Sequence, residues 1–322
     1  DVGPRLVLGA SPLSVAKVET LDLNDDAFLD ALRVTFTVPI EDATLTDSNW
    51  SLEGYGPLSR GLVPVDLADE VNDSVVYFFF AASDTPDTGA TPDLTVAPTA
   101  TVASLAGDPL NNTETPATDD TAAPQIMQTT IRDTDTDGRI DEVLVHFSES
   151  MDDATFAAAD FTIAGTPGDA IDTGTTPNDD VLIIRSNLGV FGTEAQTIAY
   201  TAGTAEDAAG NVLAATDDAG LLPQVDAAPP AVIGAESRSD SSIAVTFTEP
   251  VSGVEAADLT TDGGNITFAA VNTEANPTVV WSEASATWNT GATGTDTDAP
   301  DGTDSEGNSR DATVDLNFTA AA

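Results

Sequence analysis

The chain has 322 residues, 41% of them hydrophobic, and its 55 acidic residues against nine basic ones give a net charge of −46. This apolar content supports packed cores and argues against a disordered chain, and the length favours two or three domains. The negative charge disfavours nucleic acid and anionic membranes as partners.

Acidity of this degree strains a compact fold at low salt, because charges repel across a Debye length of about 30 Å at 0.01 M and about 3 Å at 1 M. Lys17 is the only lysine. We therefore expect a protein from a halophile; an acidic, calcium-rich surface protein from an ordinary habitat is the alternative.

Cysteine content, apolar runs and the first residue bear on location. The chain has no cysteine, so disulfides and thiolate chemistry are excluded, and no apolar run approaches the ~20 residues of a membrane span. It opens at Asp1 without Met or an apolar leader, as a secreted protein does after its signal peptide is removed. We expect an extracellular or cell-surface location without membrane insertion.

Residues 1–14 form an N-terminal extension that precedes the first repeat and contains the strand candidate Leu6-Val7-Leu8. One interpretation is a first strand of domain one, or an ordered tail. The other is a donor strand that adds to the sheet of a neighbouring copy and links copies head to tail.

The first acidic loop, residues 22–30, leads into an alternating apolar and polar stretch at 30–38. Side-chain oxygens occur at its alternate positions, and Ala27 stands where a sharp turn favours Gly. We expect a Ca²⁺ site here, with a solvated acidic turn as an equal alternative. Its expected ligands are Asp22, Asn24, Asp26 and Asp30.

The second acidic loop, residues 133–141, has the same register and carries Gly138 at the turn. Alternate carboxylates around a Gly are typical of a loop that surrounds a hard cation with oxygen ligands. An EF-hand would have Glu at the twelfth position, where this chain has Leu144, so we expect a calcium-type loop on a β-hairpin. The alternative is a solvated acidic turn. The expected ligands are Asp133, Asp135, Asp137, Asp141 and the backbone carbonyl of Arg139.

A strand pattern with Val-x-Phe recurs at 34–36, 145–147 and 245–247, and the third copy lacks an acidic loop. This spacing exceeds a solenoid repeat and fits one β-sandwich domain. We therefore predict an all-β chain of three tandem domains at 15–122, 123–228 and 229–322, joined by short proline-containing links into an elongated rod. Further strands are predicted at 15–21, 49–52, 75–81, 93–98, 125–131, 160–163, 181–186, 196–201 and 312–318.

The chain resembles the bacterial and archaeal Ig-like repeats of surface and adhesion proteins. The resemblance rests on the Asp-x-Asp-x-Asp-Gly-x-Ile-Asp loop at 133–141, the Val-x-Phe-[Ser/Thr] strand, and an Asp-x-x-Gly-Asn turn that closes two domains at 207–211 and 304–308. It covers nearly all of 15–322 and implies an Ig-like sandwich fold. It also implies Ca²⁺ at the second acidic loop, less directly at the first, and none in domain three.

Catalytic chemistry is disfavoured. With no Cys and only His146 as a histidine, nucleophile and base pairs of the Ser-His or Cys-His kind have almost no basis. Paired carboxylates among 55 acidic residues carry no information about a glycosidase. We expect no enzymatic activity.

Five Asn-x-Ser/Thr sequences are candidate glycosylation sites of a secreted glycoprotein, where glycans would shield strand edges. They are Asn49, Asn72, Asn111, Asn265 and Asn317.

These observations together predict a secreted structural protein, a subunit of an extracellular filament, pilus or S-layer-like assembly that polymerises with itself. A cell-surface adhesin or carbohydrate-binding module is the alternative, and it requires an exposed aromatic platform.

Overall fold

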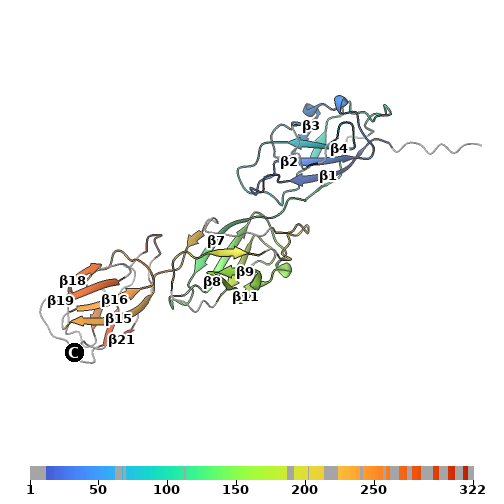
Figure 1. Cartoon of the computed structure of the whole chain (residues 1–322). Coiled ribbons are helices and arrows are strands. Elements are labelled where there is room, and N and C mark those ends of the chain that lie inside the picture. The colour runs from blue at the N-terminus through green and yellow to red at the C-terminus, as the bar shows by residue number, and fades with distance from the viewer. Residues whose placement is uncertain are drawn as a thin grey trace, which may run out of the picture.

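The protein, seen in a computed structural model, is described over residues 12–61, 67, 70–111, 114–186, 192–201, 203–213, 224–239, 242–256, 259–261, 268–273, 278–283, 293–296, 304–308 and 315–317. Its strands form three groups that follow one another along an extended chain (Figure 1). The only helices in these ranges are short 3-10 turns, so the predicted all-β class is confirmed. No helix of the described chain is long and apolar enough to cross a membrane.

The first strand group is a sandwich of two sheets. One sheet has the order β4-β2-β1-β6, and the other pairs β3 with β5. Side chains from both sheets share one core, in which the ring of Trp50 lies 5.3 Å from that of Phe78. The elements are β1 (Val15–Leu21), β2 (Ala31–Phe36), η1 (Asp42–Thr44), η2 (Asp47–Asn49), β3 (Trp50–Leu52), β4 (Val75–Phe79), β5 (Leu94–Val96) and β6 (Thr118–Asp119).

The second strand group repeats this plan with more strands. A sheet of order β11-β12-β8-β7-β14 faces a sheet of order β10-β9-β13, and Val145 and Phe161 lie in the shared core. The elements are β7 (Ile126–Arg132), β8 (Glu142–Phe147), η3 (Asp153–Thr155), η4 (Ala158–Asp160), β9 (Phe161–Ile163), β10 (Thr166–Pro167), β11 (Ala170–Asp172), β12 (Val181–Arg185), β13 (Ile198–Tyr200) and β14 (Gln224–Asp226).

The third strand group also holds two sheets, with orders β15-β16-β19-β18 and β17-β20-β21. The division into three domains at 122/123 and 228/229 agrees with this grouping but stays a prediction. The elements are β15 (Val232–Ser239), β16 (Ser242–Phe247), β17 (Leu259–Thr261), β18 (Phe268–Thr273), β19 (Thr278–Glu283), β20 (Thr293–Asp296) and β21 (Asp315–Asn317).

The Val-x-Phe pattern marks the same place in each group. Strands β2, β8 and β16 carry it, and each is hydrogen-bonded to a neighbour on both sides. The Val and Phe side chains are buried in all three strands, because alternate residues of a strand face the same side of a sheet. The pattern therefore identified a central strand of each group.

The links between groups are more ordered than the sequence predicts. The sequence at 107–123 is rich in Pro, Thr and Asp and predicts a turn and a short linker. In the structure, β6 within this stretch pairs in parallel with β1, with Thr118 opposite Val18. In the second group β14 pairs in the same way with β7. Such short polar strands carry no apolar periodicity, so the pattern could not reveal them.

The described part of the N-terminal extension, residues 12–14, belongs to the first sandwich. Leu13 is 0% exposed in its core. The Leu13 carbonyl accepts a hydrogen bond from Asn111 N at 3.0 Å, and the Pro12 carbonyl accepts one from Thr37 Oγ1 at 2.8 Å. Residues 1–11, with the proposed donor strand, lie outside the described residues.

Leu13→Ala tests this placement. We expect the free energy of unfolding of the first group to fall by about 2–5 kcal/mol, because a fully buried leucine leaves a cavity. Urea unfolding followed by tryptophan fluorescence measures it, since Trp50 lies in the same core. Leu105→Ala is the control, because Leu105 is 58% exposed. An equal effect of both substitutions would place residue 13 outside the core.

Candidate metal centres

The second acidic loop connects β7 to β8 and is organised by Asp133. Asp133 is 5% exposed, and its Oδ2 accepts a hydrogen bond from Gly138 N at 2.8 Å. Its Oδ1 is buried without a hydrogen-bond partner. Burial raises the pKa of Asp133, and the charges of Asp141 and Asp137 act in the same direction. A cation at Oδ1 would supply the missing partner and favour the ionised form.

Three of the predicted ligands come together at this loop. Carboxylate oxygens of Asp133, Asp135 and Asp141 lie within 4.8 Å of one another. Asp141 is fixed by its Oδ2, which accepts hydrogen bonds from Thr134 N at 2.7 Å and Thr134 Oγ1 at 2.8 Å. All-oxygen ligands of this kind suit Ca²⁺ rather than zinc or copper.

Asp137 is not a member of this carboxylate group, and the backbone carbonyl of Arg139 stays a predicted ligand. Asp137 lies 3.7 Å from Arg139, measured from Oδ2 to Nη1. Arg139 forms a parallel bridge with Gly192. The carbonyl of Gly138 accepts a hydrogen bond from Gly192 N at 2.8 Å.

The first acidic loop has the same backbone as the second. Asp22 Oδ2 accepts from Ala27 N at 2.8 Å, as Asp133 accepts from Gly138. Ala27 takes φ 76°, close to the 87° of Gly138, so the change from Gly to Ala has not altered the turn.

The ligands of the first loop are less well gathered. Asn24 Nδ2 donates to Asp26 Oδ2 at 2.9 Å, and Asp30 Oδ1 accepts from Leu23 N at 3.2 Å. Across the described residues, carboxylates gather in groups of three or more at three places, and this loop is not one of them. The Ca²⁺ site at Asp22–Asp30 stays a prediction.

The second acidic loop contacts the next strand group directly, and the first is connected to the next group through residues 87–89; the sequence did not reveal either arrangement. A Cβ at Gly138 would lie 2.9 Å from Thr248 Cγ2 and 3.3 Å from Ala231 Cβ, both in the third group. The first loop reaches forward through residues 87–89: Asp87 N donates to the Ala27 carbonyl at 3.1 Å. Beside it, the hydroxyls of Thr88 and Ser148 lie 2.6 Å apart across the boundary.

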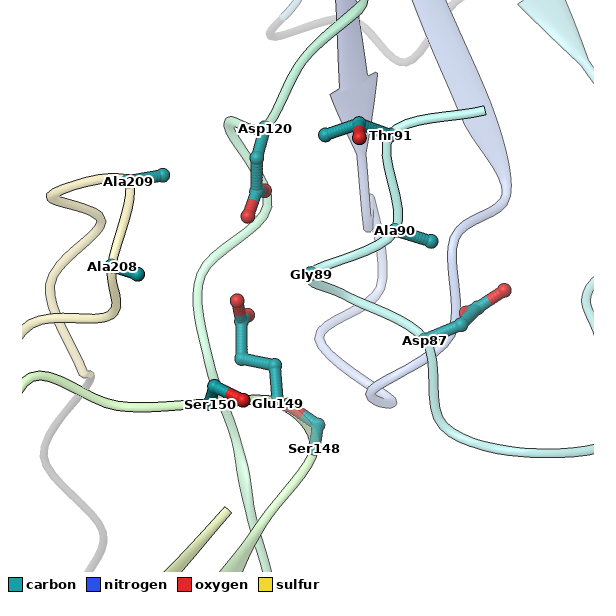
Figure 2. A pocket seen from close by; sticks show the side chains of 10 residues that line it. All are labelled: Asp87, Gly89, Ala90, Thr91, Asp120, Ser148, Glu149, Ser150, Ala208 and Ala209. Atoms are coloured by element: carbon teal, nitrogen blue, oxygen red, sulfur yellow. The ribbon is translucent and has the colours of Figure 1, made fainter. Parts of the chain in front are cut away.

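A second kind of carboxylate group occupies the first junction, which we define by Asp120, Glu149 and Asp207. Their oxygens lie within 4.8 Å of one another, beside a cavity of about 480 Å³ that Asp120 and Glu149 line. In Figure 2 the side chains of Asp120 and Glu149 point toward each other. Burial raises the pKa of Glu149, and the neighbouring charges of Asp120 and Asp207 add to the effect.

The Asp-x-x-Gly-Asn turn holds this group in place. Asp207 Oδ1 accepts hydrogen bonds from the backbone amides of Ala209, Gly210 and Asn211 at 2.6–2.8 Å. The side-chain amide of Asn211 donates through Nδ2 to Asp207 Oδ2 at 2.7 Å and to the Asp120 carbonyl at 3.4 Å. The turn therefore fastens the link from the first group onto the second group.

The second junction, defined by Asp226, Glu249, Asp304 and Glu306, repeats the first. These four residues also bring carboxylate oxygens within 4.8 Å of one another. Asn308 Nδ2 donates to Asp304 Oδ2 at 2.7 Å and to the Asp226 carbonyl at 3.1 Å. Burial raises the pKa of Asp226 to about 6 and that of Glu249 to about 7.

The sequence held a signal for these junctions. The Asp-x-x-Gly-Asn turn recurs near the ends of two predicted domains, but the recurrence does not show that each turn lies beside a link. A glutamate also follows the Val-x-Phe phenylalanine by two residues in the second and third groups, at Glu149 and Glu249. These two glutamates complete the carboxylate groups of the junctions. Only the fold shows that these three distant segments meet.

Three of the candidate glycosylation sites lie where the structure describes their side chains. Asn72 and Asn111 are exposed and Asn49 is half-buried. Asn72 Oδ1 also accepts a hydrogen bond from Asp42 N at 3.1 Å. Asn317 lies on β21, and Asn265 lies outside the described residues.

Comparisons with known proteins place this chain in no family. No protein-family model and no curated protein matches it. Among solved structures, it is similar to a Bacteroides ovatus mixed-linkage glucan utilization protein, SGBP-B, in complex with a heptasaccharide. The identity is 13% and the TM-score 0.20, over 100% of this chain and 69% of that one.

Two other similar structures come from surface proteins. One is surface layer protein SbsC, domains 1–6, with 10% identity and a TM-score of 0.23 over 97% of this chain and 55% of that one. The other is the Escherichia coli adhesin FdeC, with 12% identity and a TM-score of 0.22 over 96% of this chain and 99% of that one. This chain thus spans about half of the SbsC structure.

Gly138→Ala tests the contact between the second acidic loop and the third group. A Cβ costs about 1–2 kcal/mol of left-handed strain and also meets Thr248 Cγ2 at 2.9 Å. We expect a larger loss of stability than for Gly165→Ala, because Gly165 has a similar φ of 78° and nothing within 4 Å. Thermal unfolding measures both. Adding Thr248→Ser, which removes Cγ2 but keeps the hydroxyl, should recover the difference; no recovery would refute the contact.

Asp133→Asn tests the cation loop. The amide keeps the shape but removes the charge of the buried ligand, so we expect the chain to lose one bound Ca²⁺, or to bind it at least about tenfold more weakly, a change of about 1.4 kcal/mol. Calorimetric titration at high, constant ionic strength measures this. Asp84→Asn, at an exposed position, is the control for general loss of charge. Unchanged binding by Asp133→Asn would exclude the loop as a site.

Proposed function

We propose that this chain is a non-enzymatic, secreted structural protein, a subunit of an extracellular filament or cell-envelope assembly that polymerises with itself. The observation that carries the proposal is the repeated junction. At both boundaries an Asn amide from the following group donates to the carbonyl of the link, Asn211 to Asp120 and Asn308 to Asp226. A chain whose successive units are fastened by the same device is suited to a rod rather than to a hinged enzyme.

Cations at the acidic loops are the second part of the proposal. Each loop lies at the end of its strand group that faces the next group, so a bound Ca²⁺ would stiffen the contact as well as the loop. The buried, unpartnered Oδ1 of Asp133 supports this. A cation that binds only the folded loop stabilises it by mass action, and a hypersaline habitat would favour such a design.

Self-association through residues 1–11 is the third part. These residues precede Leu13, which is anchored in the first core. A segment that leaves a fixed point in one sandwich is placed to add a strand to another copy, since strand addition satisfies the open edge of a sheet.

The alternative, an adhesin or carbohydrate-binding module, requires exposed aromatic side chains. Trp50 is buried in the first core and cannot contribute. Trp288 lies outside the described residues. No observation on the described surface favours this second function.

Electron microscopy of the native protein at high salt tests the proposal. We expect filaments or a lattice, and their loss or softening when a chelator removes Ca²⁺. Removal of residues 1–11 should leave folded monomers that no longer assemble; the deletion stops before Leu13 so that the core remains intact.

Circular dichroism of the truncated chain is the control for folding. Dispersed rods of the full-length protein under every condition would refute the assembly and favour an adhesin. Filaments formed by the truncated chain would refute strand donation alone.

A further inference from the structure

Each junction brings carboxylates from three distant segments to one point. At the first junction Asp120 comes from the link after β6, Glu149 from the turn after β8, and Asp207 from the Asp-x-x-Gly-Asn turn. We propose that each junction holds a divalent cation, in a site distinct from the acidic loops, that locks one strand group to the next.

The strongest observation is the position of Glu149. Its Oε1 is completely enclosed and has no hydrogen-bond partner, although a buried carboxylate oxygen normally has one. A Cβ on Gly89 would lie 2.7 Å from the other oxygen, so the first group covers this side chain. Glu149 points toward Asp120 in the junction cavity (Figure 2). The Glu149 carboxylate thus has an enclosed oxygen without a partner and lies within 4.8 Å of two further carboxylates, an arrangement that suits a shared cation.

Basic side chains do not neutralise this group. The chain has nine basic residues in all, and the ion pairs found in its described part involve Lys17, Arg33, Arg60, Arg139 and Arg185, none of them with a junction carboxylate. Asp207 Oδ1 accepts hydrogen bonds from three backbone amides, which hold this carboxylate in position at the site. A cation from solution would supply the compensating charge.

The second junction is an independent copy. Glu249 is 3% exposed and Asp304 5% exposed, and both occupy the positions of Glu149 and Asp207. Glu249 Oε1 accepts a hydrogen bond from the Thr193 hydroxyl of the preceding group. At equivalent positions of two separate boundaries, Glu149 is half-buried and Glu249 is buried, and enclosing such a charge is costly unless it is paired.

The chemistry of the ligands selects the ion. Three or four carboxylates without nitrogen or sulfur favour a hard cation, and Ca²⁺ accepts irregular sets of six to eight oxygens completed by backbone carbonyls and water. The ion would join the link, which pairs with the preceding sheet through β6, to two turns of the following group. The bound ion would thereby fix the angle between successive strand groups.

The absence of cysteine permits a direct test with spin labels. Thr95→Cys and Thr166→Cys, both at exposed positions, place one label on each side of the first junction. Double electron–electron resonance at constant ionic strength then gives the distance distribution, with and without CaCl₂. We expect Ca²⁺ to narrow the distribution, and Glu149→Gln, which keeps the shape but removes the charge, to abolish the narrowing.

Matched variants separate this site from other effects. Glu114→Gln removes an exposed charge, and its label-to-label distance distribution should narrow with Ca²⁺ as much as that of the parent chain. Asp133→Asn should leave the narrowing at the first junction unchanged. Equilibrium dialysis should show one Ca²⁺ fewer per chain for Glu149→Gln and for Glu249→Gln. If the Glu149→Gln variant binds as much Ca²⁺ as the parent chain and its distance distribution narrows as fully, the junction site is refuted. Assembly into filaments is decided separately, by microscopy.

Discussion

Aspartate side chains that accept hydrogen bonds from backbone amides a few residues further on shape the ends of the strand groups. Asp22 and Asp133 each bind the amide five positions ahead, and Asp207 and Asp304 bind the amides of their own turns. Such bonds close a tight turn without regular secondary structure. They also deliver carboxylates to the ends of the sandwiches, where the next group begins.

Those carboxylates create the main electrostatic problem of the molecule. At 4.8 Å, two charges repel by roughly 3–4 kcal/mol at an effective dielectric constant of 20. At 1 M salt the Debye length of about 3 Å is shorter than this separation, so exposed charges are screened, but buried and partly buried pairs are screened much less. A hypersaline solvent therefore relieves repulsion across the surface but not inside a junction, where a localised ion is the effective remedy.

The sequence predicted the parts that depend on local patterns. Alternation located β1 at its observed bounds and marked β2, β8 and β16 as strands with buried Val and Phe side chains. The spacing of Asp133, Asp135 and Asp141 identified carboxylates that do converge. Asp137 fits the same spacing, but the pattern could not show that it lies outside this group and beside Arg139.

The features that the sequence did not predict depend on contacts between distant segments. Links such as 118–119 become strands only because β1 offers an edge. Glu149 gains meaning only when the fold places it against Asp120 and Asp207. Leu13 packs in the first core through contacts with strands that follow it, which the repeat pattern alone did not reveal. Local propensity carries no information about such partners.

The two kinds of carboxylate site are physically connected, which bears on how ions would act. Gly138 of the second acidic loop packs against Thr248, the Thr248 hydroxyl lies 2.8 Å from that of Thr193, and the Thr193 hydroxyl donates to Glu249. An ion in the loop would steady the surface on which Glu249 is held, and an ion at the junction would steady the loop. Coupling of this kind is reciprocal. Stiffness along the chain would then rise more steeply with cation concentration than independent sites allow, so that a rod assembled in brine would soften sharply on dilution.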